Sequence, residues 1–193
     1  SGYTLAAPAG YKWVGQDGKQ VLKADTSVAQ IGDTKYETLA AAVTAAESGQ
    51  TIKLLANASG NGIVVPSGTN FTLDLGGFTY TVDGDTVGST GTETNGFQLL
   101  RDSNITIQNG KITTDKAKIL IQNYSNLTLD KVELVGADVT QYVLSNNFGK
   151  TTLKNGTKIT AADGQVAFDV YYGLSAAYDA GVSVTIADAN VEI

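Results

Sequence analysis

The chain has 193 residues, with 13 Lys or Arg against 19 Asp or Glu, so its formal net charge is −6. It contains no Cys and no His, which excludes disulfides, thiolate metal sites and histidine-based catalysis, and its acidity does not favour nucleic-acid binding. No run of 18 apolar residues is present, so we expect no membrane insertion in this chain, and we expect neither a metal ion nor a cofactor.

Residues 1–27 differ in composition from the rest of the chain. Pro8, Gly10, Gly15 and Gly18 make this segment turn-rich, which predicts a short hairpin or an extended arm. The single Trp of the chain, Trp13, lies here. Two roles stay open for it: Trp13 covers part of the following domain, or it docks with Tyr11 onto a neighbouring subunit or domain.

Residues 28–193 are predicted to form one domain that opens with a short strand and a helix. The helix is expected at about 36–48, because apolar residues recur there at helical spacing. Thr34 and Glu37 have the spacing of a capping box, and Gly49 is a plausible end. An amphipathic helix at this point would cover the first strand edge of the domain.

A short strand pattern then repeats to the end of the chain. In Asn104–Ile112 a turn residue precedes an apolar–Thr–apolar triplet, a polar corner and a further apolar residue. The central residues of the copies are Lys53, Thr72, Thr106, Thr128, Thr152 and Thr185. The spacings from Thr106 to Thr128 and from Thr128 to Thr152 are 22 and 24 residues, and the two longest spacings hold insertions.

Stacking these copies produces continuous rows of apolar side chains. The flanks of each central residue point to one side of the strand, and coils stack about 4.8 Å apart. A second row is expected from Phe78, Ile112, Leu134, Ile159 and Val191. A third set is Phe97, Leu99, Ile119, Ile121, Tyr142, Leu144, Val166, Phe168 and Val170. The sequence therefore predicts an all-β fold, a parallel β-helix of about five to six coils with three short strands per coil and an N-terminal capping helix.

The segment Tyr36–Leu55 resembles the opening of pectin-lyase-like right-handed parallel β-helices. The matching parts are Tyr36-Glu37-Thr38-Leu39-Ala40-Ala41-Ala42-Val43 and Gly49-Gln50-Thr51-Ile52-Lys53-Leu54-Leu55. Residues 8–13, Ile31-Gly32-Asp33 and Leu73-Asp74-Leu75-Gly76-Gly77 are similar to segments of such domains in large bacterial cell-surface, adhesin-like proteins. The resemblance implies a right-handed coil and an extracellular or cell-surface location, while function varies widely across this fold.

Two loops and one polar face are the candidate sites. Residues 84–95 and 171–181 interrupt the repeat, and the second loop holds Tyr171, Tyr172 and Tyr178, which either stack on sugar rings or cover the last coil. Asp74, Gln108, Asp130 and Lys154 share one outward position on successive coils.

Asp74 and Asp130 are the candidate ligand-binding acids of that face. They are expected about 10 Å apart, two coils from each other, which is near the separation of an inverting carboxylate pair. Gln108 and Lys154 interrupt the acids, so a solvated structural face is the stronger interpretation and no catalytic residue is predicted.

We therefore expect a non-enzymatic extracellular or cell-surface module with a structural or adhesive role. The alternatives are a polysaccharide lyase or glycoside hydrolase, and a module that binds glycans or other molecules of a host or cell surface. The last coil still has the strand pattern at Val191 and Ile193. We expect one of three arrangements at this coil: the solenoid continues in a longer protein, a following domain covers the coil, or the arm of another subunit docks there, and the last contact would build filaments.

Overall fold

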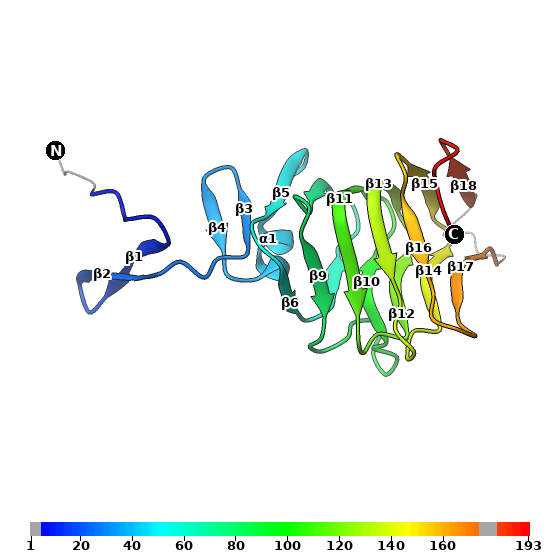
Figure 1. The fold of residues 1–193 in the computed structure, drawn as a ribbon, viewed down its shortest axis with the longest axis horizontal. Coiled ribbons are helices and arrows are strands. Elements are labelled where there is room, and N and C mark those ends of the chain that lie inside the picture. The colour runs from blue at the N-terminus through cyan, green and yellow to red at the C-terminus, as the bar shows by residue number, and fades with distance from the viewer. Residues whose placement is uncertain (1–4, 174–180) are drawn as a thin grey trace.

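The computed structural model describes residues 5–173 and 181–193, which are mostly β-strand with one short helix (Figure 1). The strands form a two-stranded sheet, a five-stranded sheet and an 11-stranded sheet. The predicted all-β class is confirmed.

The 11-stranded sheet receives one strand from each successive pass of the chain. These strands are β5 (Gln50–Leu54), β8 (Asn70–Asp74), β11 (Asn104–Thr114), β13 (Asn126–Val135), β15 (Lys150–Lys154) and β18 (Ser183–Ile186). Each pairs in parallel with the next, and Thr72, Thr106, Thr128, Thr152 and Thr185 lie side by side, as the repeat predicted. One pass through this sheet, together with the strands that follow it, is called a level below.

A corner then turns each level into a second run of strands in the same sheet. This run consists of β6 (Ala58–Gly60), β9 (Thr79–Val82), the second halves of β11 and β13, and β16 (Lys158–Thr160). At the corners of β11 and β13, Asn109 and Lys131 have φ of 56° and 57°. This left-handed backbone conformation is uncommon outside glycine, and it bends the strand sharply.

The five-stranded sheet closes the opposite side. It contains β7 (Ile63–Val65), β10 (Asn95–Leu99), β12 (Ile119–Asn123), β14 (Tyr142–Asn147) and β17 (Val166–Tyr171), all parallel. Phe97, Ile121, Leu144 and Phe168 stand in one row, which confirms that part of the predicted set. The insertion at 84–95 connects β9 to β10, as expected.

The core is one cluster of buried apolar side chains, to which both sheets contribute. Leu73, Ile107, Leu129 and Leu153 form a fully buried row of the larger sheet, at 0–1% exposure. Ile121 and Leu144 of the smaller sheet belong to the same cluster. Period-two alternation thus sends one set of side chains inward at each level and the other set to the surface.

In the levels of β5 and β8, two predicted row members are wrong by a short slip of register. Thr51, not Lys53, pairs with Thr72, because Ile52 aligns with Leu73. In the second row Tyr80, not Phe78, lies beside Ile112, since Gly76 and Gly77 lengthen that corner. A longer corner shifts every later residue of its level, and the repeat pattern alone does not reveal it.

The N-terminal end of the stack is covered by a hairpin and a helix. Strand β3 (Ala29–Ile31) runs antiparallel to both β4 (Thr34–Tyr36) and β5. Helix α1 (Leu39–Ala45) buries Leu39, Ala42 and Val43 against this end. The helix is shorter than the predicted 36–48, because residues 34–36 are extended in β4. Its N-cap is Thr38, whose hydroxyl accepts from Ala41 N, so the predicted capping box of Thr34 and Glu37 is wrong.

The arm is a separate hairpin of β1 (Tyr11–Gln16) and β2 (Lys19–Ala24), which lies apart from the stack in Figure 1. Two ion pairs connect this segment to the β3–β4 region. Lys12 pairs with Glu37, and Lys35 pairs with Asp25 at 2.5 Å. Trp13 donates to the carbonyl of Leu5 at 2.8 Å and is outside the core cluster. The interpretation of Trp13 as a cover of the stack is therefore wrong.

Candidate functional site

The outward polar face of the larger sheet brings the predicted acids into one row. Asp74 pairs in register with Gln108, Gln108 with Asp130, and Asp130 with Lys154. The strand register confirms the prediction that these four residues share one outward position. Asp74 and Asp130 are thus two levels apart, about 10 Å along the stack.

Both carboxylates are held by side chains of the following level. Asp74 accepts from Gln108 Nε2 at 3.0 Å, from Asn109 Nδ2 at 3.3 Å and from the amide of Gly76 at 3.0 Å. Asp130 accepts from Asn155 Nδ2 at 2.6 Å and pairs with Lys154 Nζ at 3.1 Å. The same arrangement, an Asp bound by the outward residue and the corner Asn of the next level, recurs two levels apart.

These contacts keep both acids ionised. Burial alone would raise the pKa of Asp74, but hydrogen bonds from Gln108, Gly76 and Asn109 outweigh it and lower the pKa. Burial likewise raises the pKa of Asp130. The hydrogen bond from Asn155 and the hydrogen bond and charge of Lys154 outweigh burial and lower this pKa below its usual 3.8. A general acid needs a raised pKa, so neither carboxyl is tuned for that role.

The lowered pKa values give the fold a defined dependence on acid. An Asp whose folded pKa is depressed stabilises the fold above the unfolded pKa, and this contribution is lost as pH falls through the folded value. We expect Asp74→Asn to lower the free energy of unfolding by about 1 kcal/mol at neutral pH. The difference from wild type should shrink below the usual Asp pKa of 3.8, as followed by urea denaturation across pH. Asp33→Asn, at an exposed turn residue, is the control. A difference that grows on acidification would contradict the assignment.

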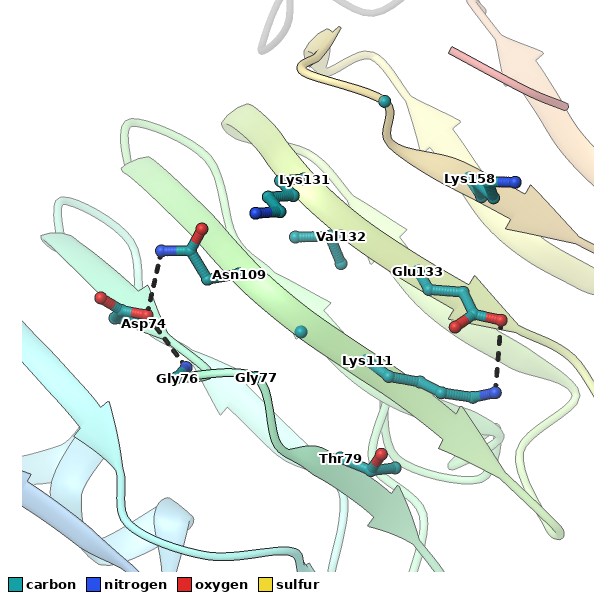
Figure 2. A pocket seen from close by; sticks show the side chains of 12 residues that line it. Asp74, Gly76, Gly77, Thr79, Asn109, Lys111, Lys131, Val132, Glu133 and Lys158 are labelled. Carbon is teal, nitrogen blue, oxygen red and sulfur yellow. Dashed lines mark hydrogen bonds and ion pairs between the residues drawn. The ribbon is translucent and has the colours of Figure 1, made fainter. Parts of the chain in front are cut away.

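The corners beside this face line a shallow groove of about 720 Å³. It crosses four levels and is lined by Asp74, Gly76, Gly77, Thr79, Asn109, Gly110, Lys111, Lys131, Val132, Glu133, Gly156 and Lys158. Figure 2 shows Lys111 facing Glu133, a contact of 3.3 Å, and Lys158 pairs with Glu192 at 2.8 Å. The ammonium of Lys131 makes no ion pair or hydrogen bond with any residue of the two described ranges.

Lys131 occupies a corner position that suits Asn better. The strand register places it between Asn109 and Asn155, whose φ values are 56° and 54°. We expect Lys131→Asn to raise the free energy of unfolding by about 0.5–1 kcal/mol, because Asn tolerates the left-handed conformation better than Lys. The reciprocal change, Asn109→Lys, should destabilise the fold and also removes the bond to Asp74. Equal unfolding midpoints for both variants would show that the corner conformation carries no such preference.

The predicted aromatic loop is in part an exposed ring cluster. Phe148 makes edge contacts with Tyr171 and Tyr172, with ring centroids 5.5 Å and 5.9 Å apart. The two tyrosines are 55% and 51% exposed. Tyr178 lies outside the described residues. Two exposed rings beside a third fit a sugar-stacking surface as well as a local packing role.

A buried polar network between the two sheets was not predicted from the sequence. Asn123 and Asn146 are fully buried in the row that Val65 and Leu99 begin and Val170 ends. Asn146 Oδ1 accepts from Asn123 Nδ2 and from Thr151 Oγ1, both at 2.9 Å. Asn146 Nδ2 donates to the carbonyls of Gly149 and Ser183 at 3.0 Å and 3.3 Å. The sequence feature that could have predicted this network is the presence of two Asn residues in an otherwise apolar row. Their hydrogen bonds satisfy backbone carbonyls at the corner that a Leu side chain would leave unpaired.

The assembly candidates lie at the two ends of the molecule. Tyr11 and Trp13 are 50% and 38% exposed on the hairpin. Ile193 is 56% exposed, and Val191 is partly buried against the core. Glu192 bridges to Lys158, so Val191 does not belong to the row of Ile159 as predicted.

Comparison of the chain with models of protein families, with curated proteins and with solved structures finds no match. Within residues 5–173 and 181–193 no helix is long and apolar enough to cross a membrane. The same residues hold no group of three or more acids placed to bind a metal ion.

Proposed function

We propose that this chain is a right-handed parallel β-helix of about five to six coils, each level being one coil. The unbroken parallel pairing from β5 to β18, with the second sheet paired in the same order, supports this architecture. Parallel crossovers are right-handed in nearly all cases, which supports the handedness. The opening Tyr36–Leu55 resembles that of pectin-lyase-like right-handed β-helices. Residues 8–13, Ile31-Gly32-Asp33 and Leu73-Asp74-Leu75-Gly76-Gly77 are similar to segments of such domains in bacterial surface proteins, and this favours an extracellular or cell-surface location.

We infer a non-enzymatic role for this β-helix, as a stiff structural or adhesive module. One observation carries the inference: Asp74 and Asp130, the candidate acid pair, are engaged by Gln108, Lys154 and two corner asparagines. Groups held in this way link adjacent coils, and neither has the raised pKa that a general acid requires.

The test is incubation of the protein with acidic and neutral polysaccharides. We expect no new reducing ends and no unsaturated products. Cleavage that disappears in Asp130→Asn but persists in Asp33→Asn would overturn the inference and favour a polysaccharide lyase or glycoside hydrolase. Small-angle scattering checks the shape separately, because a stack of coils gives an elongated particle.

Glycan binding is a second candidate function, favoured by the exposed rings of Tyr171 and Tyr172 next to Phe148. Loss of an aromatic platform weakens sugar binding through lost contact area. On a glycan array, Tyr171→Ala with Tyr172→Ala should abolish any signal, while Tyr11→Ala at the opposite end should keep it. A signal unchanged by the double substitution would place binding elsewhere.

A further inference from the structure

The hairpin of β1 and β2 is joined to the stack by a small set of polar contacts (Figure 1). In the described ranges its two strands pair only with each other, and no residue of the segment 5–24 belongs to the apolar core cluster. Of the side chains in this segment, only that of Lys12 forms a hydrogen bond or ion pair with a described residue after position 24. Neither sheet pairing nor the apolar core therefore fixes the direction of the hairpin.

Four side chains at the base of the hairpin form a chain of alternating charge, in the order Lys35, Asp25, Lys12 and Glu37. Lys35 Nζ lies 2.5 Å from Asp25 Oδ2, and Lys12 Nζ lies 3.9 Å from Asp25 Oδ1. Lys12 also pairs with Glu37 Oε1, and Glu37 Oε2 accepts from Thr26 Oγ1 at 2.6 Å. These four residues, called the hinge cluster, connect β1, the linker between β2 and β3, and the end of the stack around β4.

Most of the hinge cluster is open to solvent. The side chains of Lys12, Lys35 and Glu37 are 30%, 48% and 54% exposed. Ion pairs exposed to this degree shift an equilibrium by about fivefold at most, and salt screens them. The hydrogen bonds from Lys35 and Ser27 hold the pKa of the Asp25 carboxyl well below its usual 3.8, so this acid is charged at neutral pH. The cluster therefore favours one direction of the hairpin, but only weakly.

We propose that the hinge cluster is an ionic hinge, which holds the hairpin in one direction at low salt and releases it as salt rises. Side chains alternate along a strand, so Tyr11 and Trp13 lie on the hairpin face opposite Lys12, together with Leu22, the cross-strand neighbour of Trp13. While Lys12 is bound at the hinge, this apolar face points away from those contacts. Ionic strength then controls the direction in which the arm presents its aromatic rings.

The distance between two spin labels, measured by electron paramagnetic resonance, tests the hinge. The chain has no Cys, so Gln16→Cys on the hairpin and Lys116→Cys on a central level, both at exposed positions, supply the attachment sites. We expect a narrow distribution of distances at about 0.01 M salt, where the screening length is about 30 Å, and a broad one at about 1 M, where it is about 3 Å. At low salt, Lys12→Gln and Glu37→Gln should each widen the distribution by about twofold. The double variant should add little, because both changes remove the same ion pair.

Glu133→Gln is the matched control, since Glu133 is a 46% exposed carboxylate that pairs with Lys111 at 3.3 Å on a central level. It should leave the distribution unchanged. Thermal unfolding checks that Glu37→Gln, beside the helix cap at Thr38, leaves the stack folded, and Lys12→Gln outside the stack replaces it if it does not. A distribution that stays narrow at about 1 M salt and in the hinge variants would overturn the proposal, because other contacts would then hold the hairpin. One that is already broad at low salt, or that the control widens equally, would overturn it as well.

Discussion

Replacing Leu129 with Ala is expected to lower the free energy of unfolding by about 2–5 kcal/mol. Its side chain is fully buried in the row between Ile107 and Leu153, which are buried themselves. The neighbouring levels are held in place by strand pairing, so they cannot collapse into the space that the change creates. Urea or guanidinium denaturation measures the loss.

Ile186→Ala supplies a matched control for this experiment. Ile186 belongs to the same row but is 58% exposed in the last level. Its truncation should cost less than about 0.5 kcal/mol, as at an ordinary surface position. A loss below about 1 kcal/mol for Leu129→Ala would contradict the assigned core.

Asn146→Ala is expected to be as damaging as a large core truncation, although the residue is polar. Its amide joins Asn123 and Thr151 to the backbone carbonyls of Gly149 and Ser183. Each buried group left without a partner costs about 1–3 kcal/mol, so we expect a loss of about 2–5 kcal/mol in chemical denaturation.

The control is Asn126→Ala, in the exposed amide row of the outer face. Asn126 Nδ2 donates to Asn104 Oδ1 at 2.9 Å, where water can replace the bond. Its removal should cost about 0.5–1 kcal/mol. If Asn146→Leu left the free energy of unfolding unchanged, the network would be dispensable, because Leu restores the side-chain volume but none of the hydrogen bonds.

The repeat was enough to predict most of the stack. From Phe71 onward the alternating pattern predicted most of the side chains that enter the core, with Phe78 and Val191 as exceptions, because a slip of one residue would turn every apolar side chain outward. The same alternation placed Asp74, Gln108, Asp130 and Lys154 in one outward row. The pattern could not show that the Asp side chains are bound by corner asparagines, since that depends on the path of each corner.

The failures lie where local pattern and three-dimensional packing diverge. Residues 34–36 have a helical cap pattern, yet their pairing with β3 keeps them extended. Leu120 was not recognised as a core residue, although it is fully buried. Its side chain lies against Gly96, where a Cβ would come within 3.3 Å of Leu120 Cδ1. Such a fit between neighbouring levels is not encoded in the spacing of apolar residues.

The antiparallel strand β3 gives the whole stack a direction of growth. A parallel strand finds no matching ladder beyond β3, so each new pass is templated only by the pass before it, starting from β5. A chain that emerges N-terminus first, from a ribosome or an export pore, presents every template before the segment that copies it. The levels should then fold in order from the N-terminal end. A substitution that disrupts β8 should prevent folding of all later levels, whereas a substitution that disrupts β15 should leave a folded, protease-resistant N-terminal part.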